Sequence, residues 1–205
     1  MNFIEFRTRL FPLACFNVNQ VYAWQPDFSR NNLVRWTSQG LLIRLRQGYY
    51  TFPEYLSMAD YSFYFANRIY RPSYVSLHSA LSFYGIIPEA VTQITSITSL
   101  KTASFTNRAG IFTYRSVTED LMFGYNTRPM ADGHSLLIAT PEKALTDLLY
   151  LYPFYNSVSE MEELRLDDYF LHEELDRDLL LEYSSRINNK ALDRRIKLLM
   201  TSYAL

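Results

Sequence analysis

Apolar and polar residues in the first 55 positions follow a helical spacing at first and an extended spacing later. The predicted elements are helices over residues 2–10, Val18–Trp24 and Arg30–Gln39, then strands over Leu41–Arg46 and Tyr49–Phe52. Asn17 and Ser29 are suitable N-caps for the second and third helices, and Gly40 can end the third. Gly48 suits the tight turn between the strands, and Pro53 prevents the second strand from continuing. Three helices followed by a two-stranded wing are typical of a winged helix-turn-helix.

The third predicted helix has two unlike sides. Its apolar side holds Leu33, Val34, Trp36 and Thr37, and its polar side holds Asn31, Asn32, Arg35, Ser38 and Gln39. Arginine and amide side chains can read base edges in a DNA groove, and this face carries neither Glu nor Lys. Many small helical modules also have a polar outer face without touching DNA. The predicted contacts from this region are Ser29, Arg30, Asn31, Asn32, Arg35 and Ser38.

The predicted wing carries two arginines. Arg44 and Arg46 alternate with Ile43 and Leu45, which predicts that both arginines lie on one face of the strand. Together with Gln47, they are suited to contact phosphates beside the groove. Exposed arginines are also common on hairpins that bind nothing.

The rest of the chain predicts a mixed α/β domain that ends in helices. Residues 56–69 are aromatic and apolar without a Gly/Ser linker, which indicates a packed joint. The predicted elements are a helix capped by Ser73 and ending at Gly85, strands over Val91–Thr98, Ile111–Val117 and His134–Ala139, a helix from Thr140 to Pro153, and helical structure over 159–200 with a break near 184–189. The predicted fold class is α+β, with a winged helix-turn-helix over 1–56 and a second domain over 57–205.

Charge divides the chain into two unlike halves. Residues 1–110 carry ten basic and five acidic residues, whereas residues 111–205 carry ten basic and sixteen acidic ones. Ten of those acids lie between Glu160 and Glu182. This asymmetry suggests two surfaces with different partners, and the basic half is the one suited to nucleic acid. A charge of +5 is also within ordinary surface variation.

Four basic residues near the C-terminal end recur at spacings of four, four and three. They are Arg186, Lys190, Arg194 and Lys197. On one helix this spacing would align them on one face, where they could hold phosphate or an acidic partner. The alternative is that they pair with the acid-rich segment 160–182.

Glu142 and Lys143, at the start of a predicted helix, could bind an anion there. We favour a structural role, because an acid in the first turn offsets the helix dipole. His78 lies on another predicted helix and is interpreted as an interior or boundary histidine.

Composition excludes several classes of protein. One cysteine, Cys15, and three scattered histidines predict neither a disulfide nor a metal centre, and no cofactor is expected. The sequence has no Gly-rich phosphate loop, GxSxG, CxxC or HExxH motif, so we expect no enzyme. The apolar runs are far shorter than the roughly 20 residues of a membrane span, and the first ten residues lack a signal-peptide core. These features predict a cytoplasmic protein.

Three later segments carry a family resemblance. YRPSYVSLHSALSFYGIIPE at 70–89, the strand TQITSITS and ATPEKALTDLLYL at 139–151 resemble the AbiEi antitoxin family. WTSQGLLIRLRQGYYTF at 36–52 looks like that family's winged helix, so the likeness spans roughly residues 15–200. The resemblance implies a winged helix that represses its own promoter and a C-terminal domain that opposes a nucleotidyltransferase-like toxin, without direct contact being assumed. The acidic C-terminal half departs from relatives with a basic surface there.

The sequence therefore predicts an antitoxin and autorepressor of a type IV toxin-antitoxin operon, with double-stranded operator DNA as its partner. The alternative is a non-catalytic protein- or RNA-interaction module in which the winged helix is a docking fold. Wing arginines buried against the second domain would favour that alternative. A hydrolase or nuclease would need a carboxylate or histidine cluster, which the sequence does not supply.

Overall fold

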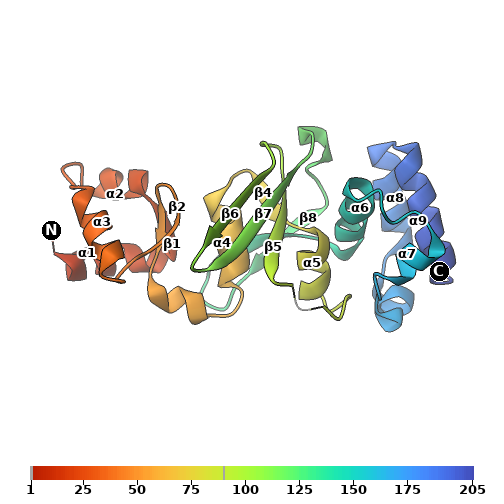
Figure 1. Ribbon diagram of the computed structural model, residues 1–205, viewed down its shortest axis with the longest axis horizontal. Coiled ribbons are helices and arrows are strands. Elements are labelled where there is room, and N and C mark those ends of the chain that lie inside the picture. Colours follow the sequence, from red (N-terminus) through yellow and green to blue (C-terminus); the bar gives the residue numbers. More distant parts are fainter. Residues whose placement is uncertain (1, 90) are drawn as a thin grey trace.

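The computed structural model describes residues 2–89 and 91–205, and it is a mixed α+β fold. The chain forms a unit of helices around a three-stranded sheet, then a six-stranded sheet, and last a group of helices. These parts follow one another along the longest dimension of the molecule, with the first and last helices at opposite ends (Figure 1). Within the described residues, none of the helices combines the length and the apolar character that a membrane span requires.

The N-terminal unit comprises residues 2–57. Its elements are α1 (Phe3–Leu10), a 3₁₀ turn (Phe11–Leu13), β1 (Cys15–Asn17), α2 (Val18–Trp24), α3 (Asn31–Ser38), β2 (Ile43–Arg46), β3 (Tyr49–Thr51) and a 3₁₀ turn (Pro53–Ser57). The helices and the hairpin lie where the sequence predicts them. Asn17 and Gln20 form a capping box that starts α2, and Gly48 takes a φ of +82° in the hairpin turn. The strand β1 was not predicted; it pairs with β3, which becomes the central strand.

An aromatic core fixes the helices of this unit. The Phe6 ring lies 4.6 Å from Trp36 and 5.6 Å from both Phe16 and Phe28, measured between ring centroids. All four side chains are buried. Because Trp36 belongs to α3, these contacts hold one side of that helix against α1 and leave the other side outward.

The six-stranded sheet and the helices against it make up the middle of the molecule. The elements are α4 (Tyr61–Ile69), β4 (Ser73–Val75), α5 (Leu77–Phe83), β5 (Gln93–Thr98), β6 (Ala103–Asn107), β7 (Gly110–Ser116), a 3₁₀ turn (Glu119–Leu121), β8 (Tyr125–Pro129), β9 (Ser135–Ala139) and α6 (Pro141–Leu151). The strand order is β6-β7-β5-β4-β9-β8, with β5–β7 and β4–β9 parallel. The helix α4 covers one face, where Tyr114 donates a hydrogen bond to the carbonyl of Ala66. The helices α5 and α6 cover the other, and Tyr74 donates to Asp147 there.

The chain ends in helices. They are α7 (Val158–Glu162), a π-helical turn (Phe170–Glu174), α8 (Arg177–Ile187) and α9 (Lys190–Ser202). Of these, α8 and α9 pack on α6, and α7 packs on α9. Asn188, with a φ of +51°, makes the break between α8 and α9 that the sequence predicts.

One predicted helix begins at the wrong place. Ser73 does not cap a helix; it starts β4, and α5 begins at Leu77 after Ser76. Tyr74 and Val75 are fully buried between β5 and β9, where aromatic and β-branched residues suit a central strand. Long-range pairing therefore overrides the local proline-and-serine helix signal.

Candidate nucleic-acid interface

The helix α3 presents its unpacked side to solvent. Asn31, Val34, Arg35 and Ser38 are exposed, and Asn32 is half-buried. Val34 was predicted on the buried side, and this prediction is wrong because the residue is 68% exposed. Of the α3 residues, Leu33 and Trp36 are the ones buried in the core. The Arg35 Nη2 donates a 3.0 Å hydrogen bond to Oδ1 of Asn32, which orients the guanidinium on the exposed face.

At the start of α3, Ser29 is exposed but does not cap the helix, which corrects the sequence prediction. Arg30 occupies the N-cap position with helical backbone angles. Backbone carbonyls, in place of a capping side chain, accept hydrogen bonds from amides in the first turn. The amide of Asn32 donates to the carbonyl of Ser29, and the amide of Leu33 donates to the carbonyl of Arg30, each at 3.0 Å. The Arg30 Nε donates to the hydroxyl of Tyr22 at 3.0 Å, so α2 holds this guanidinium in place.

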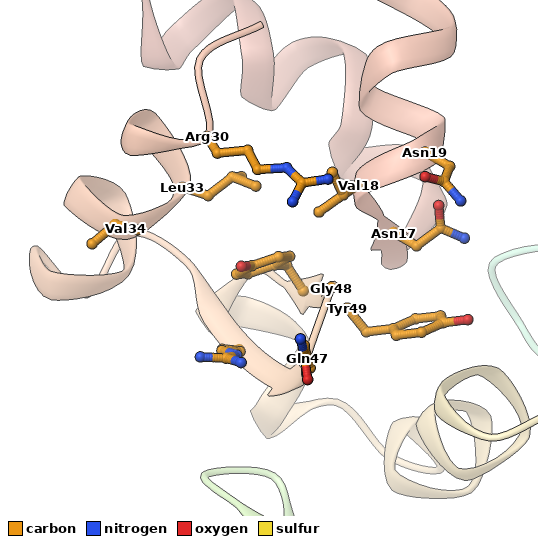
Figure 2. A pocket seen from close by; sticks show the side chains of 11 residues that line it. Asn17, Val18, Asn19, Arg30, Leu33, Val34, Gln47, Gly48 and Tyr49 are labelled. Atoms are coloured by element: carbon orange, nitrogen blue, oxygen red, sulfur yellow. The ribbon is translucent and has the colours of Figure 1, made fainter.

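The β2–β3 hairpin faces α3 across a hollow of about 430 Å³, which we call the α3 groove. Figure 2 shows Arg30 reaching into it from α3 and Gln47 at its opposite side. Arg44 also lines it, and both Arg44 and Gln47 are exposed. The amide of Val18 donates to the carbonyl of Gly48 at 3.0 Å, which ties the hairpin turn to the start of α2. The lining of the α3 groove includes no Asp or Glu, so its electrostatics favour the binding of an anion.

Arg46 does not lie with Arg44. A register irregularity between the two residues separates them in the pairing of β2 with β3. The Arg46 Nη1 donates a 2.7 Å hydrogen bond to the carbonyl of Ile69, and the guanidinium lies 4.9 Å from the Tyr70 ring centroid and 4.6 Å from that of Phe105. The predicted shared face of the two arginines is therefore corrected: Arg46 joins the N-terminal unit to the six-stranded sheet, and its phosphate contact stays a prediction.

We expect Arg46→Ala to lower the free energy of unfolding by about 1–3 kcal/mol, because it removes a charged hydrogen bond and two cation–π contacts. Arg44→Ala, the matched exposed control on the same strand, should change it by less than about 0.5 kcal/mol. Urea unfolding measures both. Equal, small losses for the two variants would show that Arg46 does not hold the joint.

The four basic residues near the C-terminal end do not share one helix, which corrects that prediction. Arg186 belongs to α8, where its guanidinium lies 3.9 Å from the centre of the Phe123 ring. Lys190, Arg194 and Lys197 are exposed on α9, and Arg194 donates to Asn156 at 2.8 Å. Across residues 2–89 and 91–205, no ion pair joins any of the four to the acid-rich segment. The alternative of internal pairing is therefore wrong for the described residues, and the second interaction surface stays a prediction.

A buried polar cluster, which we define as Tyr74, Ser76, Lys143 and Asp147, lies between β4 and α6. The Lys143 ammonium donates to Asp147 at 2.6 Å, and Asp147 also accepts hydrogen bonds from Tyr74 at 2.9 Å and Ser76 at 2.8 Å. Lys143 is fully buried, so the cluster supports the structural interpretation of the helix start. Asp147 was not among the predicted site residues, although the i, i+4 spacing of Lys143 and Asp147 was a usable signal.

His78 is half-buried, as expected for a boundary histidine. Its Nε2 lies 3.4 Å from the Tyr155 hydroxyl in a hollow of about 520 Å³ that Glu89 and Glu163 also line. Burial lowers the pKa of His78 below its usual value, so the ring is neutral at pH 7. The lining of this hollow therefore includes two carboxylates, whereas the lining of the α3 groove includes none.

Within the part of the chain that the structure describes, no three His, Cys, Asp or Glu side chains group as metal ligands would. Known proteins give no further guide to the site: no family model matches this chain, and no curated protein matches it. The exposed face of α3 and the α3 groove are therefore the candidate functional site.

Proposed function

We propose that this protein binds duplex DNA through its N-terminal unit, which acts as a winged helix-turn-helix, and that it represses its own operon. The observation that carries this proposal is the convergence of Arg30, Arg44 and Gln47 on one groove whose lining includes no carboxylate. The polar face of α3 supplies groups that pair with base edges, and the hairpin supplies groups that pair with phosphates.

The antitoxin role is part of the same proposal and is supported by the sequence motifs alone. These motifs resemble the AbiEi family, and that likeness implies a nucleotidyltransferase-like toxin as functional partner, without direct contact being assumed. No catalytic step is assigned to the chain.

A docking module for protein or RNA is the second candidate. The observation in its favour is the packing of Arg46 against Ile69, Tyr70 and Phe105, because one wing arginine is thereby partly buried against the second domain. Arg44 on the same strand is exposed and lines the α3 groove, which favours the DNA-binding proposal.

A gel-shift assay with the DNA upstream of the protein's own gene tests the proposal. We expect a shift that survives competition by unrelated duplex and weakens with salt, because phosphate contacts release counterions. Arg44→Ala should make the slope of log K against log salt shallower by about 1. Arg165→Ala, which removes the same charge at a site with 67% side-chain exposure near Glu89, should leave the slope unchanged. A failure of the wild-type protein to shift any duplex would contradict DNA binding.

A further inference from the structure

The β2–β3 hairpin borders a second hollow on the side away from α3. This hollow, which we call the edge hollow, has a volume of about 530 Å³. It is lined by residues 44–47 of the hairpin and by residues 104–107 of β6. Both β2 and β6 are edge strands of their sheets, so the hollow lies where the edges of the two sheets face each other.

The edge hollow and the α3 groove share two lining residues. Arg44 and Gln47 line both, so the two hollows meet at the hairpin. Neither lining includes an Asp or Glu, whereas the hollow beside His78 includes two glutamates. A polyanion that enters the α3 groove therefore meets no acidic lining residue on its way past the hairpin tip.

The joint between the hairpin and β6 is held by specific contacts. The Asn107 side chain donates a 2.8 Å hydrogen bond to the carbonyl of Leu45, and Arg46 lies over the Phe105 ring. Because β6 is tied to the hairpin in this way, a duplex bound by α3 and the hairpin would also lie beside β6.

The exposed side of β6 carries groups that suit phosphate. Ser104 and Thr106 are exposed, and their alternate positions place both hydroxyls on the same side of the strand. As an edge strand, β6 also presents backbone groups that pair with no other strand. Hydroxyls and backbone amides are common donors to phosphate oxygens.

We propose that the edge hollow receives the sugar-phosphate backbone of the same duplex that α3 reads, so that the C-terminal part of the chain contacts DNA directly through β6. This inference rests on the proposed DNA binding. It assigns a DNA contact to the six-stranded sheet, where the sequence motifs predicted none.

Opposite charges at one exposed position of β6 test the inference in the full chain. Thr106→Glu should weaken duplex binding roughly threefold or more at 50 mM salt, and Thr106→Lys should strengthen it by a similar factor. The salt slope should become shallower by about 1 for the first and steeper by about 1 for the second. Thr127 is exposed on β8, the opposite edge of the same sheet, so Thr127→Glu and Thr127→Lys are matched controls that should bind nearly as the wild type does.

The gain expected from Thr106→Lys cannot come from misfolding, so the pair stays informative if Thr106→Glu folds poorly. If the wild type and Arg44→Ala behave as proposed while both Thr106 variants match their Thr127 controls, this inference is wrong and DNA binding stands. If the wild type binds no duplex, DNA binding and this inference fail together.

Discussion

Asp147→Ala should lower the free energy of unfolding by about 3–5 kcal/mol, which is the range for breaking a buried ion pair by removing one partner. The carboxylate is buried and accepts three hydrogen bonds, from Lys143, Tyr74 and Ser76. Burial raises the pKa of Asp147, and the Lys143 ammonium opposes that rise. Without the carboxylate, the buried ammonium would retain the carbonyl of Leu121 and the ring of Phe123 as its described contacts.

A double variant that lacks both charges identifies the cause of this loss. Lys143→Met with Asp147→Leu removes both charges, so the double variant should recover most of the stability that Asp147→Ala loses. Urea unfolding followed by circular dichroism measures each free energy. If Asp147→Ala costs less than about 1 kcal/mol, the pair does not hold α6 to β4 as described.

Arg35→Ala should weaken operator binding by about 1–3 kcal/mol and relax the choice of base at one position. The side chain is exposed on α3, and Asn32 orients its guanidinium. A planar guanidinium can donate two parallel hydrogen bonds to guanine O6 and N7, which gives this discrimination between bases. A lysine ammonium lacks this paired donor geometry.

Arg35→Lys is the matched control because it keeps the charge. We expect it to bind unrelated duplex about as well as the wild type and to lose the preference for one base at the position that Arg35 contacts. Titrations against operators with single base-pair changes measure this preference. A uniform loss of affinity for all sequences would assign Arg35 to a phosphate and not to a base.

Elements with strong local signals could be predicted from the sequence. Asn17 caps α2, and Thr140 with Pro141 starts α6, where the Thr140 hydroxyl accepts a hydrogen bond from the amide of Lys143. Gly48 adopts the left-handed backbone conformation that the hairpin turn requires. In each case the residue that starts or turns the element lies within a few residues of it, so the local sequence is sufficient to predict the element.

The missed features depend on distant residues. The strands β6 and β8 are edges of the sheet with exposed polar residues, so neither shows a strong apolar alternation. Arg46 is directed to the joint by Ile69 and Phe105, which no local pattern reveals. The exposed face of α3 was predicted correctly except for Val34, because Trp36 and Leu33 alone define the buried side.

The proposed function requires that the exposed face of α3 enter a groove of duplex DNA, and affinity cleavage tests this claim directly. Burial raises the pKa of Cys15 to about 12, so this thiol stays protonated and inert at neutral pH. Ser38→Cys, on the exposed face, therefore offers a single site for attaching iron-EDTA. Ser185→Cys, exposed on α8, is the control at the far end of the molecule (Figure 1).

We predict that the Ser38→Cys conjugate cuts the operator within a few base pairs of one position on each strand, whereas the Ser185→Cys conjugate leaves bound DNA intact. Bound DNA that the Ser38→Cys conjugate leaves uncut, or cuts no differently from the Ser185→Cys conjugate, would contradict the claim.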